Sequence, residues 1–131
     1  MNRLFADTSY FIALFQHHDF AHVRAVQFTA QNQRRLVTSE WIICEIGNFV
    51  SRSDLRPLLQ ALIGEIKLTC EIVHASHASF SSGLDLFLQR PDKNWSLTDC
   101  ISFVIMQEKG ISEALTTDHH FEQAGFAALL K

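Results

Sequence analysis

Short apolar segments alternate with longer amphipathic segments along the whole chain. The short segments, which suit strands buried on both faces, predict strands at residues 4–6, 36–37, 69–73, 114–116 and 126–129. The longer segments predict helices at residues 8–15, 20–33, 40–51, 54–67, 76–89 and 98–109, with a further short helix after Asp118. Strands that alternate with helices favour an α/β fold, in which a short parallel sheet of four to five strands has helices on both faces.

The size and composition of the chain favour one folded domain, residues 1–131. Apolar residues make up 47% of the chain and charged residues 19%, which is enough apolar material for a core. The formal net charge is −3, so the chain lacks the global basic character of many nucleic-acid-binding proteins. A polyanionic partner would have to be attracted by a local patch or by a bound metal ion.

The three cysteines, Cys44, Cys70 and Cys100, form no CxxC pair. We expect them to be small buried apolar residues in a reducing cytoplasm, not disulfide or zinc-site residues. No apolar run approaches the roughly 18 residues of a membrane span. An acid at position 7 comes too early for the core of a signal peptide. The expected location is therefore cytoplasmic, with no membrane association.

Three aspartates lie where predicted strands end or helices begin. Asp7 and Asp118 each follow a strand, and binding sites of parallel sheets gather beyond the carboxyl ends of strands, so these two should lie close together. A plainer interpretation is that each aspartate caps a helix. It is strongest for Asp99, because Ser96 to Asp99 fits a capping box.

Glu45 does not fit the capping interpretation, because it lies in the middle of a predicted helix. Its neighbours are apolar on nearly all sides, which predicts that the helix and Glu45 are buried. An unpaired buried carboxylate is costly, and no Lys or Arg lies one helical turn away from it. A metal ion is the simplest compensation, and carboxylate clusters suit Mg²⁺ or Mn²⁺. Two such ions can activate a water molecule and stabilise the leaving oxygen of a phosphodiester.

Four segments carry a more specific signal, namely FADTSYFIALF, TSEWIICEIGN, SLTDCISFVIMQEKGI and ALTTDHHFEQAGF. Together they resemble the PIN-domain family, including the ribonuclease toxins of VapC type, in the order and placement of their acids. The resemblance extends over nearly the whole chain. It implies a PIN-like fold and a metal-dependent endoribonuclease that uses Mg²⁺ or Mn²⁺. It also implies an RNA substrate, frequent homodimerisation and, for a toxin, a small antitoxin protein as partner.

Residue by residue, the resemblance assigns catalysis and metal binding to the four acids, which are Asp7, Glu45, Asp99 and Asp118. It also matches Ser9 and Thr116 to small polar positions that support the acids, although both could simply bond nearby backbone.

Substrate contacts are less well defined by the sequence. Arg52, Arg90 and Lys93 lie in or beside predicted loops and are candidates to bind phosphate, although solvated surface charge is the plainer interpretation of each. Trp95 could stack a base or pack in the core. His119 and His120 are expected at the surface, with at most one of them near the substrate, because neighbours on a helix point about 100° apart.

Two functions from other classes remain as alternatives. One is a non-catalytic PIN-type module that binds nucleic acid or a protein. The other, less favoured, is a receiver-type signalling domain, which needs paired acids after its first strand, whereas Thr8 follows Asp7. An aspartate-nucleophile phosphatase would need an acid where Ser9 stands.

Overall fold

The computed structural model describes residues 2–131 and contains a five-stranded sheet with strand order β3-β2-β1-β4-β5. Every neighbouring pair of strands is parallel, which confirms the predicted parallel sheet. The strands are β1 (Arg3–Ala6), β2 (Arg35–Ser39), β3 (Cys70–Val73), β4 (Glu113–Leu115) and β5 (Ala127–Ala128).

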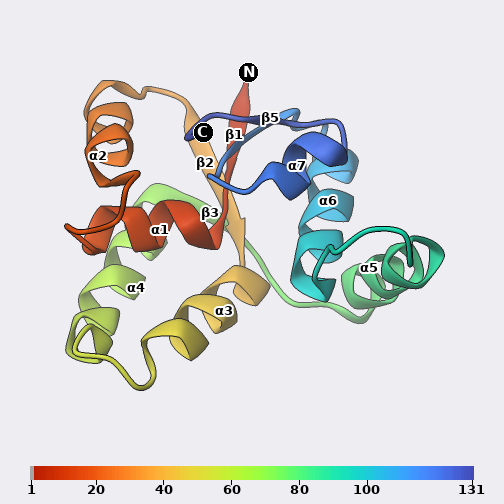
Figure 1. Ribbon diagram of the computed structural model, residues 1–131, viewed down its shortest axis with the longest axis horizontal. Coiled ribbons are helices and arrows are strands. Elements are labelled where there is room, and N and C mark those ends of the chain that lie inside the picture. Colours follow the sequence, from red (N-terminus) through yellow and green to blue (C-terminus); the bar gives the residue numbers. More distant parts are fainter. Residues whose placement is uncertain (1) are drawn as a thin grey trace.

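Helices cover both faces of this sheet, as predicted. They are α1 (Thr8–Phe15), α2 (His22–Gln31), α3 (Glu40–Val50), α4 (Leu59–Thr69), α5 (His77–Gln89), α6 (Leu97–Lys109) and α7 (His119–Gln123). In Figure 1, α1, α2 and α4 lie to the left of the sheet, α3 lies below it, and α5 to α7 lie to the right. The chain therefore winds along one face first and returns along the other, as in doubly wound α/β folds.

The predicted helix over residues 54–67 is wrong in its first part. A 3₁₀ turn occupies Arg56–Leu58, and α4 begins only at Leu59. Pro57 explains the difference, because a proline has no N–H to donate and fits only the first turn of a helix.

The winding direction changes between β1 and β4, which lie side by side in the middle of the sheet. Phe5 pairs with Ala114 and Ala6 with Leu115, so both strands end at the same level. The chain leaves β1 toward α1 on one face and leaves β4 toward α7 on the other. This divergence opens a crevice at the carboxyl edge of the sheet, directly beside Asp7 and Asp118.

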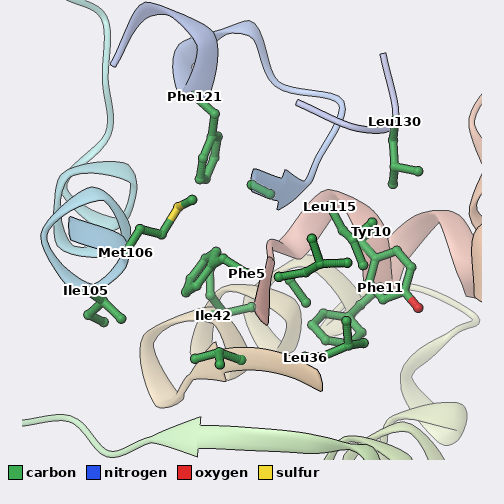
Figure 2. Close-up of a cluster of buried hydrophobic side chains, with 14 of the residues drawn as sticks. Phe5, Tyr10, Phe11, Leu36, Ile42, Ile105, Met106, Leu115, Phe121 and Leu130 are labelled. Atoms are coloured by element: carbon green, nitrogen blue, oxygen red, sulfur yellow. The ribbon is translucent and has the colours of Figure 1, made fainter. Parts of the chain in front are cut away.

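A continuous apolar core fixes these elements around the crevice. Figure 2 shows Phe5 of β1 among side chains from both layers, including Ile42 of α3, Met106 of α6 and Phe121 of α7. Trp95 belongs to the same core, because it is only 6% exposed and its Nε1 donates to Gln123 Oε1 over 3.0 Å. Its role is therefore packing, and the alternative of base stacking is not supported.

Two expectations about burial are wrong. The helix α3 is not buried all round: Ile42, Ile46 and Val50 face the core, whereas Cys44 and Phe49 are exposed. Apolar composition concealed this helical periodicity. Glu45 is consequently half-buried, and of the cysteines only Cys100 is fully buried. Within residues 2–131, no helix combines the length and apolar character needed to cross a membrane.

Candidate functional site

The four acids singled out in the sequence line one pocket at the carboxyl edge of the sheet. They reach it from four places in the fold. Asp7 follows β1, Glu45 lies in the middle of α3, Asp99 lies in the first turn of α6, and Asp118 precedes α7. Residues separated by more than 100 positions in the sequence thus meet where the winding of the sheet changes direction.

Asp7 is buried and is held by two hydroxyl groups. Its Oδ2 accepts hydrogen bonds from Thr116 Oγ1 over 2.8 Å and from Ser9 Oγ over 3.2 Å. It occupies the N-cap position of α1, but its side chain makes no capping hydrogen bond, so the capping interpretation is wrong for this residue.

The same two hydroxyl groups connect β1 to the segment that follows β4. Ser9 Oγ accepts from the backbone N–H of Thr117 over 3.1 Å, and Thr116 Oγ1 accepts from the N–H of Asp118 over 3.0 Å. Ser9 and Thr116 therefore fix the distance between the two strand ends, and with it the position of Asp7 relative to Asp118.

Asp99 and Asp118 do act as helix caps. Asp99 and Ser96 form a reciprocal capping box, in which Asp99 Oδ2 accepts from the Ser96 N–H over 3.1 Å. Asp118 Oδ1 accepts from the N–H of His120 over 2.9 Å. Capping occupies one oxygen of each carboxylate, so it does not exclude a second role for the other oxygen.

His120 lies inside the pocket, and the expectation that it would be a surface residue is wrong. Its side chain is only 19% exposed, and its Nδ1 lies 3.1 Å from Asp99 Oδ2 and 3.3 Å from Asp118 Oδ1. His119 is exposed but also lines the pocket, with its Nδ1 3.6 Å from Asp118 Oδ1, so the expectation that at most one of the two histidines lies near the site is wrong as well. His120 thus connects two acids that come from different elements.

Glu45 has a partner that the sequence did not reveal. Thr8 Oγ1 donates a short hydrogen bond to Glu45 Oε1, which connects the start of α1 to the middle of α3. Thr8 stands directly after Asp7, but a threonine at the start of a helix gives no sign that it bonds a carboxylate 37 residues away.

In each of the four carboxylates, one oxygen accepts the hydrogen bonds described above. The donors described above reach a single oxygen of each, namely Oδ2 of Asp7, Oε1 of Glu45, Oδ2 of Asp99 and Oδ1 of Asp118. Within the described chain, this leaves the second oxygen of Glu45, Asp99 and Asp118 without a protein hydrogen-bond donor.

Burial and mutual repulsion raise the pKa of three of these carboxylates, those of Asp7, Glu45 and Asp99. Burial, with smaller contributions from Asp99 and Glu45, raises the pKa of Asp7 from 3.8 to about 7. Burial is also the main cause that raises the pKa of Glu45 and that of Asp99, and the charge of Asp118 adds to both. Among the described residues, no lysine or arginine lines the pocket to offset this repulsion. The electrostatics therefore favour a cation from outside the protein.

The three basic residues considered for substrate binding lie outside the lining of this pocket. Arg90 donates two hydrogen bonds of 3.0 Å to Asp92, and its guanidinium group lies 5.1 Å from the centre of the Trp95 ring. Arg52 is exposed and Lys93 is partly exposed. Contact of these side chains with RNA stays a prediction.

Comparison with known proteins identifies the family to which this chain belongs. The model of the PIN domain family matches residues 4–127. The chain is 25% identical to the 23S rRNA-specific endonuclease VapC20 of Mycobacterium tuberculosis over 124 residues, which cover 94% of this chain and 95% of that protein.

Solved structures agree with the sequence match. One of them is the crystal structure of VapC20 from Mycobacterium tuberculosis, which is described as a sarcin-ricin loop cleaving toxin. It superposes on this chain with a TM-score of 0.86 at 25% identity, and the match covers 95% of this chain and 96% of the VapC20 chain. VapBC2 from Rickettsia felis, bound to a promoter DNA fragment, superposes with a TM-score of 0.70 at 13% identity over 96% of both chains, and shows the shared fold alone. Since the family model spans nearly the whole chain, this protein belongs to the PIN domain family.

Proposed function

We propose that this protein is a metal-dependent endoribonuclease of VapC type. The observation that carries the proposal is the convergence of four carboxylates in one pocket, each held on one oxygen by a neighbouring donor. Membership of the PIN domain family and the similarity of this chain to an rRNA-specific endonuclease support RNA as the substrate class.

The residues present fit a divalent ion with a preference for oxygen ligands. Asp7, Glu45, Asp99 and Asp118 would hold Mg²⁺ or Mn²⁺, since both ions prefer carboxylate oxygens. Burial next to other negative groups raises the pKa of Asp7, and a bound cation would offset the cost of ionising its carboxyl group.

Each supporting residue has a defined task in this proposal. Ser9 and Thr116 orient Asp7, Thr8 orients Glu45, and His120 holds Asp99 and Asp118 together. Because neighbouring donors aim the carboxylates in advance, little reorganisation is needed when ligands arrive. A bound divalent ion supplies Lewis acidity toward a phosphate oxygen and lowers the pKa of water.

RNA is the proposed substrate, and protein partners are part of the same proposal. The first RNA to assay is the sarcin-ricin loop, because a relative that aligns over nearly the full chain is described by its cleavage. As a toxin, the protein would be neutralised by a small antitoxin. Exposed apolar side chains such as Val23, Leu68 and Leu88 provide surface for such a partner or for a second copy of the chain.

A cleavage assay tests the proposal. Purified protein is incubated with sarcin-ricin loop RNA in Mg²⁺, in Mn²⁺ and in EDTA, alongside the variants Asp99→Asn and Glu108→Gln. Glu108 is the matched control, because it is an exposed acid on the same helix as Asp99. We expect cleavage with either ion by the parent and by Glu108→Gln, and at least a hundredfold loss in EDTA and in Asp99→Asn.

Activity that survives EDTA, or an Asp99→Asn variant as active as the parent, would contradict the proposed mechanism. A parent protein that binds this RNA with metal present but leaves it intact would instead favour the non-catalytic PIN-type module.

A further inference from the structure

Two exposed phenylalanines line the same pocket as the four acids. Phe20 is 78% exposed and Phe49 is 51% exposed. Single exposed apolar residues are common on protein surfaces, but here two large rings from different elements border one polar site. Neither ring is used by the core or by the hydrogen bonds that hold the acids.

The position of Phe49 follows from the geometry of α3. Phe49 comes four residues after Glu45, so both side chains project from the same face of the helix, one turn apart. The side of α3 that presents a carboxylate to the pocket therefore also presents an aromatic ring at the pocket edge.

Phe20 is held outward by a fixed turn between α1 and α2. Asp19 Oδ1 accepts from the N–H of Ala21 over 2.8 Å, and the backbone oxygen of Asp19 accepts from the N–H of His22 over 3.0 Å. Ala21, directly after Phe20, is fully buried, and the His22 ring nitrogen Nδ1 lies 2.7 Å from the carbonyl oxygen of Ala13. This anchored turn keeps the Phe20 ring in solvent beside the acids, ready to be covered by a ligand.

The composition of the pocket limits how it can hold RNA. Its lining includes five acids, the fifth being Asp19, and within the described residues no lysine or arginine. Within the pocket, attraction for the phosphate backbone must therefore come mainly from bound cations. The two phenylalanine rings can bind nucleobases directly, since each base has an aromatic face that stacks on a side-chain ring.

We propose that Phe20 and Phe49 form a base-stacking subsite that holds unpaired RNA bases next to the phosphate to be cleaved. This inference rests on the proposed function, because it places RNA in the acidic pocket. The subsite takes single-stranded nucleotides, since bases inside a duplex do not expose their faces. It favours RNA loops and bulges over continuous helices.

Equilibrium binding of a short single-stranded RNA that carries one 2-aminopurine base tests the subsite. The titration is done in Ca²⁺ to slow turnover, and gel electrophoresis checks that the RNA stays intact. Fluorescence anisotropy reports affinity, and quenching of 2-aminopurine reports stacking. The variants are Phe20→Ala, Phe49→Ala and their conservative counterparts Phe20→Tyr and Phe49→Tyr. Phe87→Ala is the matched control, because Phe87 is 40% exposed on α5 but lies outside the pocket.

We expect each alanine variant to lose roughly tenfold in RNA affinity together with part of the quenching. The tyrosine variants and Phe87→Ala should bind like the parent. Alanine variants with parental affinity and quenching would overturn the inference. So would alanine variants that keep their RNA affinity but change the sedimentation of the free protein, since that result would assign the rings to a protein contact.

The cleavage assay separates this inference from the proposed function. If the parent cleaves RNA in a metal-dependent way and the alanine variants bind as it does, only the stacking subsite is wrong. If stacking is observed but no metal-dependent cleavage occurs, the subsite stands and the nuclease proposal fails.

Discussion

The surroundings of Asp7 determine both the orientation and the ionisation of its carboxyl group. It is one of the few buried acids among the described residues, where it forms no ion pair and instead accepts hydrogen bonds from Thr116 and Ser9. These neutral donors orient the carboxylate without neutralising it. Its surroundings therefore favour either a proton or a metal ion, and the choice between them depends on pH.

This choice predicts a pH-dependent stability of the metal-free protein. The pKa of Asp7 is raised from 3.8 to about 7, so between these values the folded protein keeps a proton that the unfolded chain has lost. The free energy of unfolding should therefore fall as pH rises from about 4 to about 7, by up to about 4 kcal/mol from this residue. Thermal unfolding in EDTA should give a lower Tm at pH 8 than at pH 5.

The variant Asp7→Asn should raise the Tm at pH 8 and flatten the profile, because asparagine still accepts the two hydroxyl hydrogen bonds but carries no charge. Asp85→Asn, an exposed acid on α5, should leave the profile as in the parent. A parent profile with no fall between pH 5 and pH 8 would contradict the role given to burial.

Thr116 provides a second prediction at this scale. Thr116→Val removes the donor to Asp7 and the acceptor for the N–H of Asp118 while keeping the shape of the side chain. Loss of such an orienting partner typically weakens metal binding about 10-fold to 100-fold. Calorimetric titration with Mn²⁺ should show this loss for Thr116→Val and much less of it for Thr116→Ser.

The control for Thr116 is Thr38→Val. Thr38 is also fully buried and donates its hydroxyl to the carbonyl oxygen of Ala6, but it does not line the acidic pocket. Equal losses of Mn²⁺ affinity in both variants would show that general destabilisation, and not the orientation of Asp7, is responsible.

At the level of single residues, the sequence indicated the acids and three of their hydrogen-bond partners, Ser9, Ser96 and Thr116, but not the other two. The acids stand at element boundaries, which is a readable signal, and Glu45 was conspicuous as an acid in an apolar helix. Thr8 and His120 were missed because their roles depend on which helix lies opposite, and that is decided by packing.

Among the elements, α5 and α6 pack closely against each other at Gly83, where a larger side chain has no room. A Cβ added to Gly83 would lie 2.3 Å from Ile101 Cγ1 and 2.9 Å from Ile101 Cα. Only a glycine lets the two helices approach this closely. Because α6 also carries Asp99, this contact helps to set how far one acid reaches into the pocket.

Gly83→Ala should therefore destabilise the protein, although alanine favours helices. The expected loss in the free energy of unfolding is about 1–3 kcal/mol, the usual cost of overpacking a core. Gly64→Ala in α4 is the matched control, since among the described residues a Cβ added there would meet no neighbouring side chain or other element within 4 Å. This second variant should be neutral or stabilising by up to about 1 kcal/mol. Urea unfolding measures both, and equal stability of the two variants would contradict the close approach.

The elements themselves were largely predictable, because the alternation of short apolar and longer amphipathic segments survives in the sequence. The prediction failed where one residue overrides a pattern, as Pro57 does at the start of α4. It also failed for α3, where apolar residues on the outer face, such as Phe49, gave the appearance of a helix buried on every side.

In the molecule as a whole, the strand order brings distant residues together. The order β3-β2-β1-β4-β5 places the first and fourth strands side by side, so that the ends of a 131-residue chain contribute to one pocket. Strand alternation predicts such a parallel sheet, but the register of β1 against β4 depends on tertiary packing. The position of the crevice could be predicted, because binding sites of parallel sheets lie beyond the carboxyl ends of the strands. The two exposed phenylalanines at its edge could not be predicted from the sequence.

The absence of lysine and arginine from the described lining of the pocket has a consequence for how the protein responds to salt. Proteins that grip nucleic acid through basic side chains displace condensed ions from the backbone, and their affinity falls steeply as ionic strength rises. A pocket that relies on stacked rings and one or two coordinated cations neutralises few phosphates and so displaces few of those ions. Association with RNA should therefore depend only weakly on monovalent salt, and a steep slope would show that basic residues outside the pocket bind the backbone.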